Sequence, residues 1–341
     1  MGTKMSKLPK NKKSIVRLCI SALIVIVGIL CIAVISRPNG LKETKTVSIE
    51  QGLSTGSIAD VLKDEKVISS KLFFLLKVNL SKYKGQLKYG SFEFSPDDGY
   101  DSVIQKLATG GAKRDSVSVT VPEGYSAEKI IALLSQKGLG SEEDFKNAMN
   151  DSYDYDFLKN IKPPKECKYK LQGFLFPSTY EFYKDSKPHD IIDKMLSEFE
   201  KQYKTLSASY DKLFEVITKA SMIERESKTD EDRPKIAGVI ENRLNTGMKL
   251  QIDATVVYAI SDGMYDVNRV YYKDLEVDSP YNTYKYNGLP VGPIASPGLK
   301  SIEAALNPEK HDYFYYRTDS TKNDGSHVFS KDFEEHKAAD K

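Results

Sequence analysis

The sequence is poor in cysteine, and the positions of its three cysteines exclude a disulfide framework. Cys19 and Cys31 lie inside a long apolar run near the N-terminus, so Cys167 is the only cysteine in the rest of the chain. A single cysteine cannot form an internal disulfide. The chain after the apolar run must therefore be stabilised by an ordinary hydrophobic core, and 341 residues with 40% hydrophobic content can supply one.

Motifs of several common enzyme classes are missing. The chain contains no Gly-x-Ser-x-Gly, no His-Glu-x-x-His and no phosphate loop ending in Gly-Lys-Ser/Thr. Its four histidines are scattered, and a single cysteine outside the apolar run accompanies them, so no metal-ligand pattern is present. The sequence therefore predicts neither a metal nor a cofactor.

Acidic residues are absent from residues 1–17, which carry six basic groups. The whole chain has 50 basic and 48 acidic residues, so 44 basic and 48 acidic ones remain after residue 17, a net charge of −4. A body of that charge is a poor general binder of nucleic acid.

An uncharged apolar run follows the basic segment, over residues 18–35. As a helix it would be about 27 Å long, close to the thickness of a hydrocarbon core. A cleaved signal peptide is less favoured, because residues 33–36, Ala-Val-Ile-Ser, make a poor cleavage site. We therefore expect a single-pass transmembrane helix over residues 18–36, in the cell membrane. Its basic tail, residues 1–17, would be cytoplasmic and everything after it extracytoplasmic.

Two units are expected beyond a polar linker of residues 37–45. Residues 46–115 show the order strand, helix, helix, strand and a further helix near 100–107, an order similar to that of LysM carbohydrate-binding modules and also of many other small α+β units. Residues 116–341 begin with an alternating strand at 116–121, a Pro-Glu-Gly turn and a helix at 127–136. The aromatic residues of segment 171–182 suit either a core or sugar stacking. The predicted class is α+β, with a transmembrane helix, a small LysM-like α/β subdomain and a larger mixed α/β domain.

Three glutamates lie on a predicted helix over residues 213–226. At ~100° per residue, Glu224 falls in the middle of the apolar face, whereas Glu215 and Glu226 fall on the polar face. A carboxyl held against apolar neighbours has a raised pKa and can donate a proton near neutral pH, as general-acid catalysis on a glycosidic bond requires. The alternative is a structural glutamate paired with a nearby cation, such as Arg225 or Arg243.

From residue 220 onward the chain carries a series of further motifs in a fixed order. They read ASMIERE (220–226), VIENRL (239–244), LQIDATVVYA (250–259), SPYNTY (279–284), GLPVGPIASPG (288–298), AALNP (304–308) and GSHVF (325–329). With the Pro-Glu-Gly turn, the Gly-Phe-Leu-Phe-Pro block at 173–177 and the predicted anchor, this series resembles the YceG-like family of endolytic murein transglycosylases over nearly the whole chain. One departure is Gln172, where the family often has glutamate, and it puts any acid role at that position in doubt.

The resemblance implies a membrane-anchored lyase with a LysM-like subdomain and a catalytic domain at residues 116–341. Such an enzyme cuts nascent glycan strands internally, at the β-1,4 bond between N-acetylmuramic acid and N-acetylglucosamine. It leaves a 1,6-anhydromuramyl end and thereby ends strand elongation. The catalytic glutamate of the family falls on Glu224, which would protonate the glycosidic oxygen and then accept the proton of the muramyl C6 hydroxyl.

Eight further residues of the matched motifs are candidates for substrate binding. Asp253 also suits a helix N-cap, Asn242 a hydrogen bond to a neighbouring loop, and His327 a buried core position. The loop at 281–284 offers hydroxyls, an amide and rings for gripping sugar substituents. The full set is Asn242, Gln251, Asp253, Tyr281, Asn282, Thr283, Tyr284 and His327.

Two other functions stay open. One is a non-catalytic scaffold that binds peptidoglycan and holds cell-wall synthases near new strands. The other is hydrolysis, which would need a second carboxylate, for which Asp253 is the candidate. The expected partners are peptidoglycan strands and the membrane. The family also suggests penicillin-binding proteins and the elongation or division complex.

Overall fold

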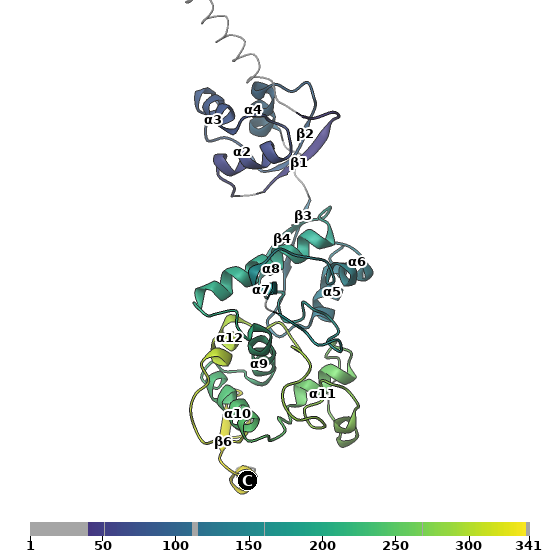
Figure 1. Cartoon of the computed structure of the whole chain (residues 1–341), viewed down its shortest axis with the longest axis vertical. Coiled ribbons are helices and arrows are strands. Elements are labelled where there is room, and N and C mark those ends of the chain that lie inside the picture. The colour runs from purple at the N-terminus through teal and green to yellow at the C-terminus, as the bar shows by residue number, and fades with distance from the viewer. Residues whose placement is uncertain (1–39, 51, 111–114, 160, 268, 339–341) are drawn as a thin grey trace, which may run out of the picture. The chain divides into compact units, whose positions relative to one another are not determined.

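The computed structural model describes residues 40–50, 52–110, 115–159, 161–267 and 269–338 (Figure 1). The predicted basic tail and anchor, residues 1–36, lie outside this part of the chain. The chain divides after Asp115 into two compact units, each with its own hydrophobic core. No helix in the described ranges is long and apolar enough to cross a membrane.

The first unit packs three helices against a two-stranded antiparallel sheet. The strands are β1 (Lys45–Ile49) and β2 (Gly90–Phe94), and the helices are α2 (Thr55–Asp64), α3 (Lys71–Leu80) and α4 (Tyr100–Thr109). Helices α2 and α3 begin after serines whose hydroxyls accept a hydrogen bond from the first turn, which fixes where each helix starts. The sequence predicts all five elements, because each has a local signal.

The second unit opens with the sheet formed by β3 (Ser116–Thr120) and β4 (Thr179–Tyr183), which pair antiparallel. Helices α5 (Ala127–Gln136), α6 (Glu142–Ala148), α7 (Asp156–Lys159) and α8 (Pro188–Thr205) accompany this sheet. The side chains of the 171–182 aromatic segment are largely buried: Phe174 and Leu175 have no exposed surface, and Phe174 packs on Phe157 and Phe199. These rings therefore belong to the core, one of the two alternatives for this segment.

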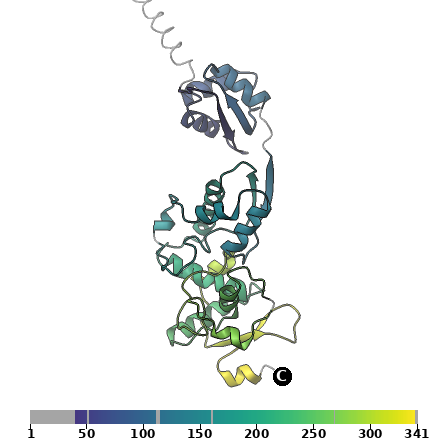
Figure 2. The same cartoon turned by 90° about the vertical axis from the view of Figure 1, so that its right-hand side faces the viewer.

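The rest of the second unit surrounds helix α9 (Leu213–Glu226), which contacts the three following α-helices of the chain (Figure 1). These are α10 (Arg233–Asn245), α11 (Asp253–Ile260) and α12 (Leu299–Leu306), with a short 3-10 helix, η1 (Tyr272–Glu276), after α11. A hairpin of β5 (Tyr315–Thr318) and β6 (His327–Ser330) follows, and α13 (Phe333–Ala338) comes after it near the C-terminus (Figure 2).

Helix α9 is buried on all sides over residues 220–223 rather than on one face. Residues 220–223 are four consecutive buried positions, and at ~100° per residue they cover the whole circumference of the helix. Glu224 is nearly buried and the Glu215 side chain is 43% exposed, as the wheel predicts. The prediction that Glu224 alone is desolvated is wrong for Glu226, which is also desolvated because other elements cover it, while Arg225 beside it is exposed.

Candidate active site

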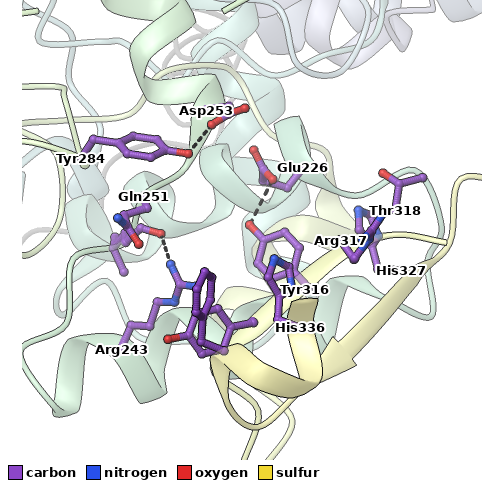
Figure 3. A pocket seen from close by; sticks show the side chains of 13 residues that line it. Glu226, Arg243, Gln251, Asp253, Tyr284, Tyr316, Arg317, Thr318, His327 and His336 are labelled. Atoms are coloured by element: carbon purple, nitrogen blue, oxygen red, sulfur yellow. Dashed lines mark hydrogen bonds between the residues drawn. The ribbon is translucent and has the colours of Figure 1, made fainter. Parts of the chain in front are cut away.

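The C-terminal end of α9 opens into a pocket of about 350 Å³ (Figure 3). We call it the Glu226 pocket. Its walls come from α9, α10, the segment leading into α11, the β5–β6 hairpin and α13. The side chains that line it are Glu226, Arg243, Leu250, Gln251, Asp253, Tyr284, Tyr315, Tyr316, Arg317, Thr318, His327, Phe333 and His336.

Glu226 points from the end of α9 towards Tyr316 of β5, and the Tyr316 hydroxyl donates a hydrogen bond of 3.0 Å to its Oε2 (Figure 3). Burial raises the pKa of Glu226 to about 7, and the nearby Asp253 carboxylate adds to this shift. The hydrogen bonds from Tyr316 and from the Ala254 backbone act in the opposite direction, because they stabilise the charged form. A carboxyl with this pKa can both donate and accept a proton near neutral pH.

Replacing Tyr316 with phenylalanine is expected to raise the pKa of Glu226 further. The substitution removes a hydroxyl that donates to the carboxylate while leaving burial in place, so the charged form loses stabilisation. An NMR titration of side-chain-labelled glutamate measures the shift. Tyr315→Phe is the matched control, since the Tyr315 ring stacks on Phe333 and His336. A lower pKa in Tyr316→Phe would contradict this account.

Glu224 occupies a different environment, away from the residues that line the Glu226 pocket. Its Oε2 accepts hydrogen bonds from the Ser301 hydroxyl at 2.7 Å and from the Gly298 backbone N–H at 3.1 Å. Its Oε1 lies 3.6 Å from the Arg233 guanidinium, and both of these side chains are nearly buried. Gly298 is the N-cap of α12, so the carboxylate lies at a helix N-terminus, where negative charge is stabilised. These contacts join α9, α10 and α12.

A second carboxyl, that of Glu123 in the Pro-Glu-Gly turn, lies in the same region, although the Glu123 residue as a whole is exposed. Burial and the charge of Glu224 raise its pKa, and Arg233 partly offsets this. The Glu123 carboxyl packs against Gly298 so closely that a Cβ at Gly298 would lie 1.9 Å from its Oε1. Sequence reasoning treated this glutamate only as part of a turn, because nothing local links it to α12.

We expect Gly298→Ala to lower the free energy of unfolding by about 1 kcal/mol, the low end of the usual cost of overpacking, because the overlapped group is the end of an exposed side chain that can move. The added methyl group would overlap the Glu123 carboxyl and disturb the N-terminus of α12. Thermal or denaturant unfolding measures the change. Gly99→Ala is the control, because Gly99 is also an N-cap and has no atom within 4 Å of the position of an added Cβ. Equal stability of the two variants would show that the overlap does not matter.

Four of the residues predicted to bind substrate line the Glu226 pocket: Gln251, Asp253, Tyr284 and His327. Asp253 is the first residue of α11 and makes no capping bond; its carboxylate accepts a hydrogen bond from the Tyr284 hydroxyl. The N-cap is Ile252, so the capping interpretation of Asp253 is wrong by one residue. Gln251 has a φ of 50°, a left-handed conformation that costs a non-glycine residue energy and is common at functional sites.

His327 is held in a fixed orientation by a buried acid. Its Nδ1 lies 3.0 Å from the Asp232 carboxylate, and its backbone N–H donates to the same oxygen at 2.8 Å. Its ring meets that of Tyr316 edge-on, with centroids 5.5 Å apart. His327 is therefore both a satisfied buried histidine and a lining residue of the pocket, which combines the two alternatives considered for it.

The other four predicted substrate-binding residues do not line the Glu226 pocket. Asn242 donates hydrogen bonds to the carbonyls of His311 and Tyr313, as the loop-contact alternative predicts. Tyr281 is buried beside Cys167. Asn282 and Thr283 are 1% exposed, and their polar atoms bind backbone groups and Thr255. All four make the contacts of a scaffold, and burial leaves Tyr281, Asn282 and Thr283 no access to a ligand.

This scaffold holds the lining residues in place. Thr283 accepts a hydrogen bond from the Ile252 N–H and, through its carbonyl, one from the Gln251 N–H, so it fixes the segment that leads into Asp253. The Asn282 side chain accepts a hydrogen bond from the backbone N–H of Tyr284. Asn242 secures the chain just before β5, which carries Tyr316. Residues inside and outside the pocket thus form one connected structure.

Arg243 and Tyr316 are lining residues that sequence reasoning did not propose for the site. Arg243 is buried, donates hydrogen bonds of 2.6 Å to the carbonyls of Phe314 and Leu250, and lies over the Tyr315 ring. Burial lowers its pKa. Tyr316 lies 90 residues after Glu226 in the chain, and no local signal connects the two. The dense run of aromatic residues at 313–316 was the one feature of the sequence that could have indicated a role for Tyr316 in the site.

A larger hollow of about 850 Å³ is also lined in part by α10, and its lining includes Glu241, Asn242 and His311. Its one α10 carboxylate, Glu241, pairs with Lys219. The Glu226 pocket is smaller, and it contains the carboxyl whose pKa lies near 7. Among the residues that the structure describes, no three His, Cys, Asp or Glu side chains gather in a way that could hold a metal ion.

Comparisons with known proteins cover most of the chain. The YceG-like family matches residues 47–341. The endolytic murein transglycosylase of Bacillus subtilis is 38% identical over 313 residues, which cover 87% of this chain and 84% of that protein. The enzyme of the same name from Streptococcus pneumoniae is 29% identical over 321 residues, 86% of this chain and 57% of that longer protein. A crystal structure of a yceG-like protein from Listeria monocytogenes aligns with a TM-score of 0.54 at 34% identity, over 87% of this chain and 99% of that one.

Proposed function

Because this chain belongs to the YceG-like family, we propose that it is an endolytic murein transglycosylase. It cleaves the β-1,4 bond between N-acetylmuramic acid and N-acetylglucosamine within a glycan strand and leaves a 1,6-anhydromuramyl end. Its relative from Bacillus subtilis carries this name and matches along most of both chains. Cleavage inside nascent strands would end their elongation.

The observation that carries the proposal is that Glu226, one of the residues that line the pocket, has a pKa raised to about 7. A general acid works best when its pKa lies near the operating pH, because it is then protonated often enough to donate and acidic enough to do so. The pocket, about 350 Å³, is of a size that suits a small ligand or part of a larger one.

The reaction needs one group that acts first as acid and then as base. Protonated Glu226 donates its proton to the glycosidic oxygen as the bond from that oxygen to C1 of the muramyl residue breaks. The resulting carboxylate then accepts the proton of the C6 hydroxyl as that oxygen bonds to C1. Glu226 ends protonated, and no water is consumed. The Tyr316 hydroxyl stabilises the intermediate carboxylate and fixes its direction.

The family resemblance assigns the acid to Glu224, and our proposal of Glu226 instead rests on its place in the pocket lining and on its raised pKa. Glu224 is bound by Ser301, Gly298 and Arg233 and does not line the pocket. The two glutamates lie two residues apart on one helix, Glu224 at the motif position of the family's catalytic residue. Glu224 remains a prediction for the catalytic residue, and the paired substitutions described in the Discussion distinguish the two.

The proposal extends to the location of the enzyme, the role of its first unit and its protein partners. Residues 18–36 would anchor the chain in the cell membrane with its N-terminus in the cytoplasm, which the uncharged run and the basic tail support. The first unit would act as a LysM-like module on glycan strands, supported by its order of strands and helices. Penicillin-binding proteins and the elongation or division complex are the proposed protein partners.

Digestion of uncrosslinked glycan strands by the full chain, followed by mass spectrometry of the fragments, tests this function. We expect internal fragments with new ends one water lighter than hydrolysis products. Ends carrying that water would indicate a hydrolase and direct attention to Asp253 as the second carboxylate. Strands that are bound but stay intact would favour the non-catalytic scaffold.

A further inference from the structure

Helix α3 of the first unit presents an apolar stripe to solvent. Leu72, Leu76 and Leu80 are 79%, 53% and 78% exposed. They are four residues apart, so they share one face of the helix over a length of about 12 Å. The buried residues of α3, Phe74 and Val78, lie on the opposite face and join the core. The three leucines therefore make no contribution to the core of their own unit.

The sequence on and next to this helix is basic. Residues 66–92 contain six lysines and no aspartate or glutamate. Lys71 and Lys77, on α3 itself, pair with Asp60 of α2 and Asp101 of α4. The excess positive charge therefore comes from the loop that follows the helix, where Lys82, Lys84 and Lys88 are exposed. Exposed Tyr89 adjoins this loop.

A row of exposed leucines beside a cationic loop is characteristic of proteins that rest on a membrane surface. The apolar side chains enter the boundary between headgroups and acyl chains, and lysines attract anionic headgroups. Single exposed leucines are ordinary in soluble proteins, whereas three in one row with a loop of one charge sign require an explanation.

We propose that the α3 surface, formed by Leu72, Leu76, Leu80 and the loop 81–88, binds the surface of a lipid bilayer that contains anionic headgroups. Charge complementarity selects this occupant. The position of the apolar run agrees with a membrane-bound first unit, because the run ends at residue 35 and β1 begins at Lys45. Ten residues span at most about 35 Å. This last point rests on the proposed anchor, while the exposure and the charge stand without it.

The absence of tryptophan from the chain permits a direct test. Leu76→Trp places a single indole on the α3 surface, and the exposed position of Leu76 allows the fold to be kept. The full-length variant is reconstituted into phosphatidylcholine vesicles with one third phosphatidylglycerol, with and without lipids brominated on their acyl chains. We expect blue-shifted emission that the brominated lipids quench about twofold. Tyr272→Trp is the control, because Tyr272 is 92% exposed in the second unit, and its emission should stay unquenched.

The lysines are tested by Lys82→Gln, Lys84→Gln and Lys88→Gln together in the Leu76→Trp chain. Quenching should fall towards the level seen in vesicles of phosphatidylcholine alone. Exposed Lys162, Lys165 and Lys170, replaced by glutamine together, form the matched control and should change nothing.

Two results would overturn the proposal. Unquenched emission of a solvent-exposed indole would show that the surface stays in water. A blue shift that brominated lipids do not quench, and that grows with protein concentration, would show instead that a second copy covers the α3 surface. These substitutions leave the Glu226 pocket intact, so cleavage of glycan strands in solution reports separately on the proposed enzymatic function.

Discussion

Replacing Glu226 with glutamine is expected to lower kcat for glycan cleavage by about 10²–10⁴, the usual contribution of a general acid. Glutamine keeps the size of the side chain and can still hydrogen bond with Tyr316, but it cannot donate a proton to the leaving oxygen. Substrate binding should change little, since the shape of the pocket is kept. Initial rates of strand cleavage together with a strand-binding assay separate these two effects.

The control for this substitution lies two residues earlier on the same helix. Glu224→Gln should leave the folded enzyme with most of its kcat, because Glu224 contacts Ser301, Gly298 and Arg233 rather than the pocket. The opposite ranking, in which Glu224→Gln abolishes cleavage and Glu226→Gln does not, would move the catalytic acid to Glu224. It would also leave the raised pKa of Glu226 without a role in the reaction.

The same pair of substitutions is expected to change stability in opposite directions. The pKa of Glu226 is about 7 in the folded protein, against 4.5 for an ordinary glutamate, so the folded state favours the protonated form. This favourable contribution is fully present below pH 4.5 and is lost as pH rises through 7. Glutamine resembles the protonated form at every pH. Above pH 7, Glu226→Gln should therefore be more stable than the unsubstituted protein by about 3 kcal/mol.

For Glu224→Gln the expected change is a loss of stability. The substitution removes one of the carboxylates near the nearly buried guanidinium of Arg233, the others being Asp230 and Glu123. Losing the charged partner of a buried charged group costs at least about 1 kcal/mol. Urea unfolding at pH 4.5 and at pH 8 measures both variants. A Glu226→Gln variant that is less stable than the unsubstituted protein at pH 8 would show that its carboxyl is not held in an unfavourable charged state.

Secondary structure with a local cause could be predicted from the sequence. The alternation at 116–121 and the Pro-Glu-Gly turn before the helix at 127–136 correspond to β3 and α5 in the structure. The serine caps of α2 and α3 belong to the same class. Each signal lies within a few residues of the element that it starts or ends, so tertiary packing did not need to be known.

The environments of Glu224 and Glu226 could not be predicted in this way. A wheel places both residues relative to the other side chains of α9, whereas their surroundings are set by other elements of the chain. Ser301 of α12 binds Glu224, and Tyr316 of β5 binds Glu226. Which residues line the pocket depends on these long-range contacts, and the sequence of the helix alone does not predict them.

The exposure of the α3 surface could not be predicted from the sequence either. The leucine-rich pattern of residues 72–76 correctly predicts a helix, and the exposure of Leu72 and Leu76 becomes visible only when the core of the first unit is known. Leucines on a short helix usually face the core. Here two other residues, Phe74 and Val78, take that position, which leaves the leucines for another contact.

Cleavage of glycan strands by the full chain in H₂¹⁸O tests the central claim most directly. A lytic transglycosylase forms the new bond from the C6 hydroxyl of the muramyl residue itself, so mass spectrometry should find new ends without ¹⁸O and one water lighter than hydrolysis products. These ends should be depleted with Glu226→Gln. New ends that carry ¹⁸O would show that water attacks C1, and the proposed lytic reaction would then be wrong.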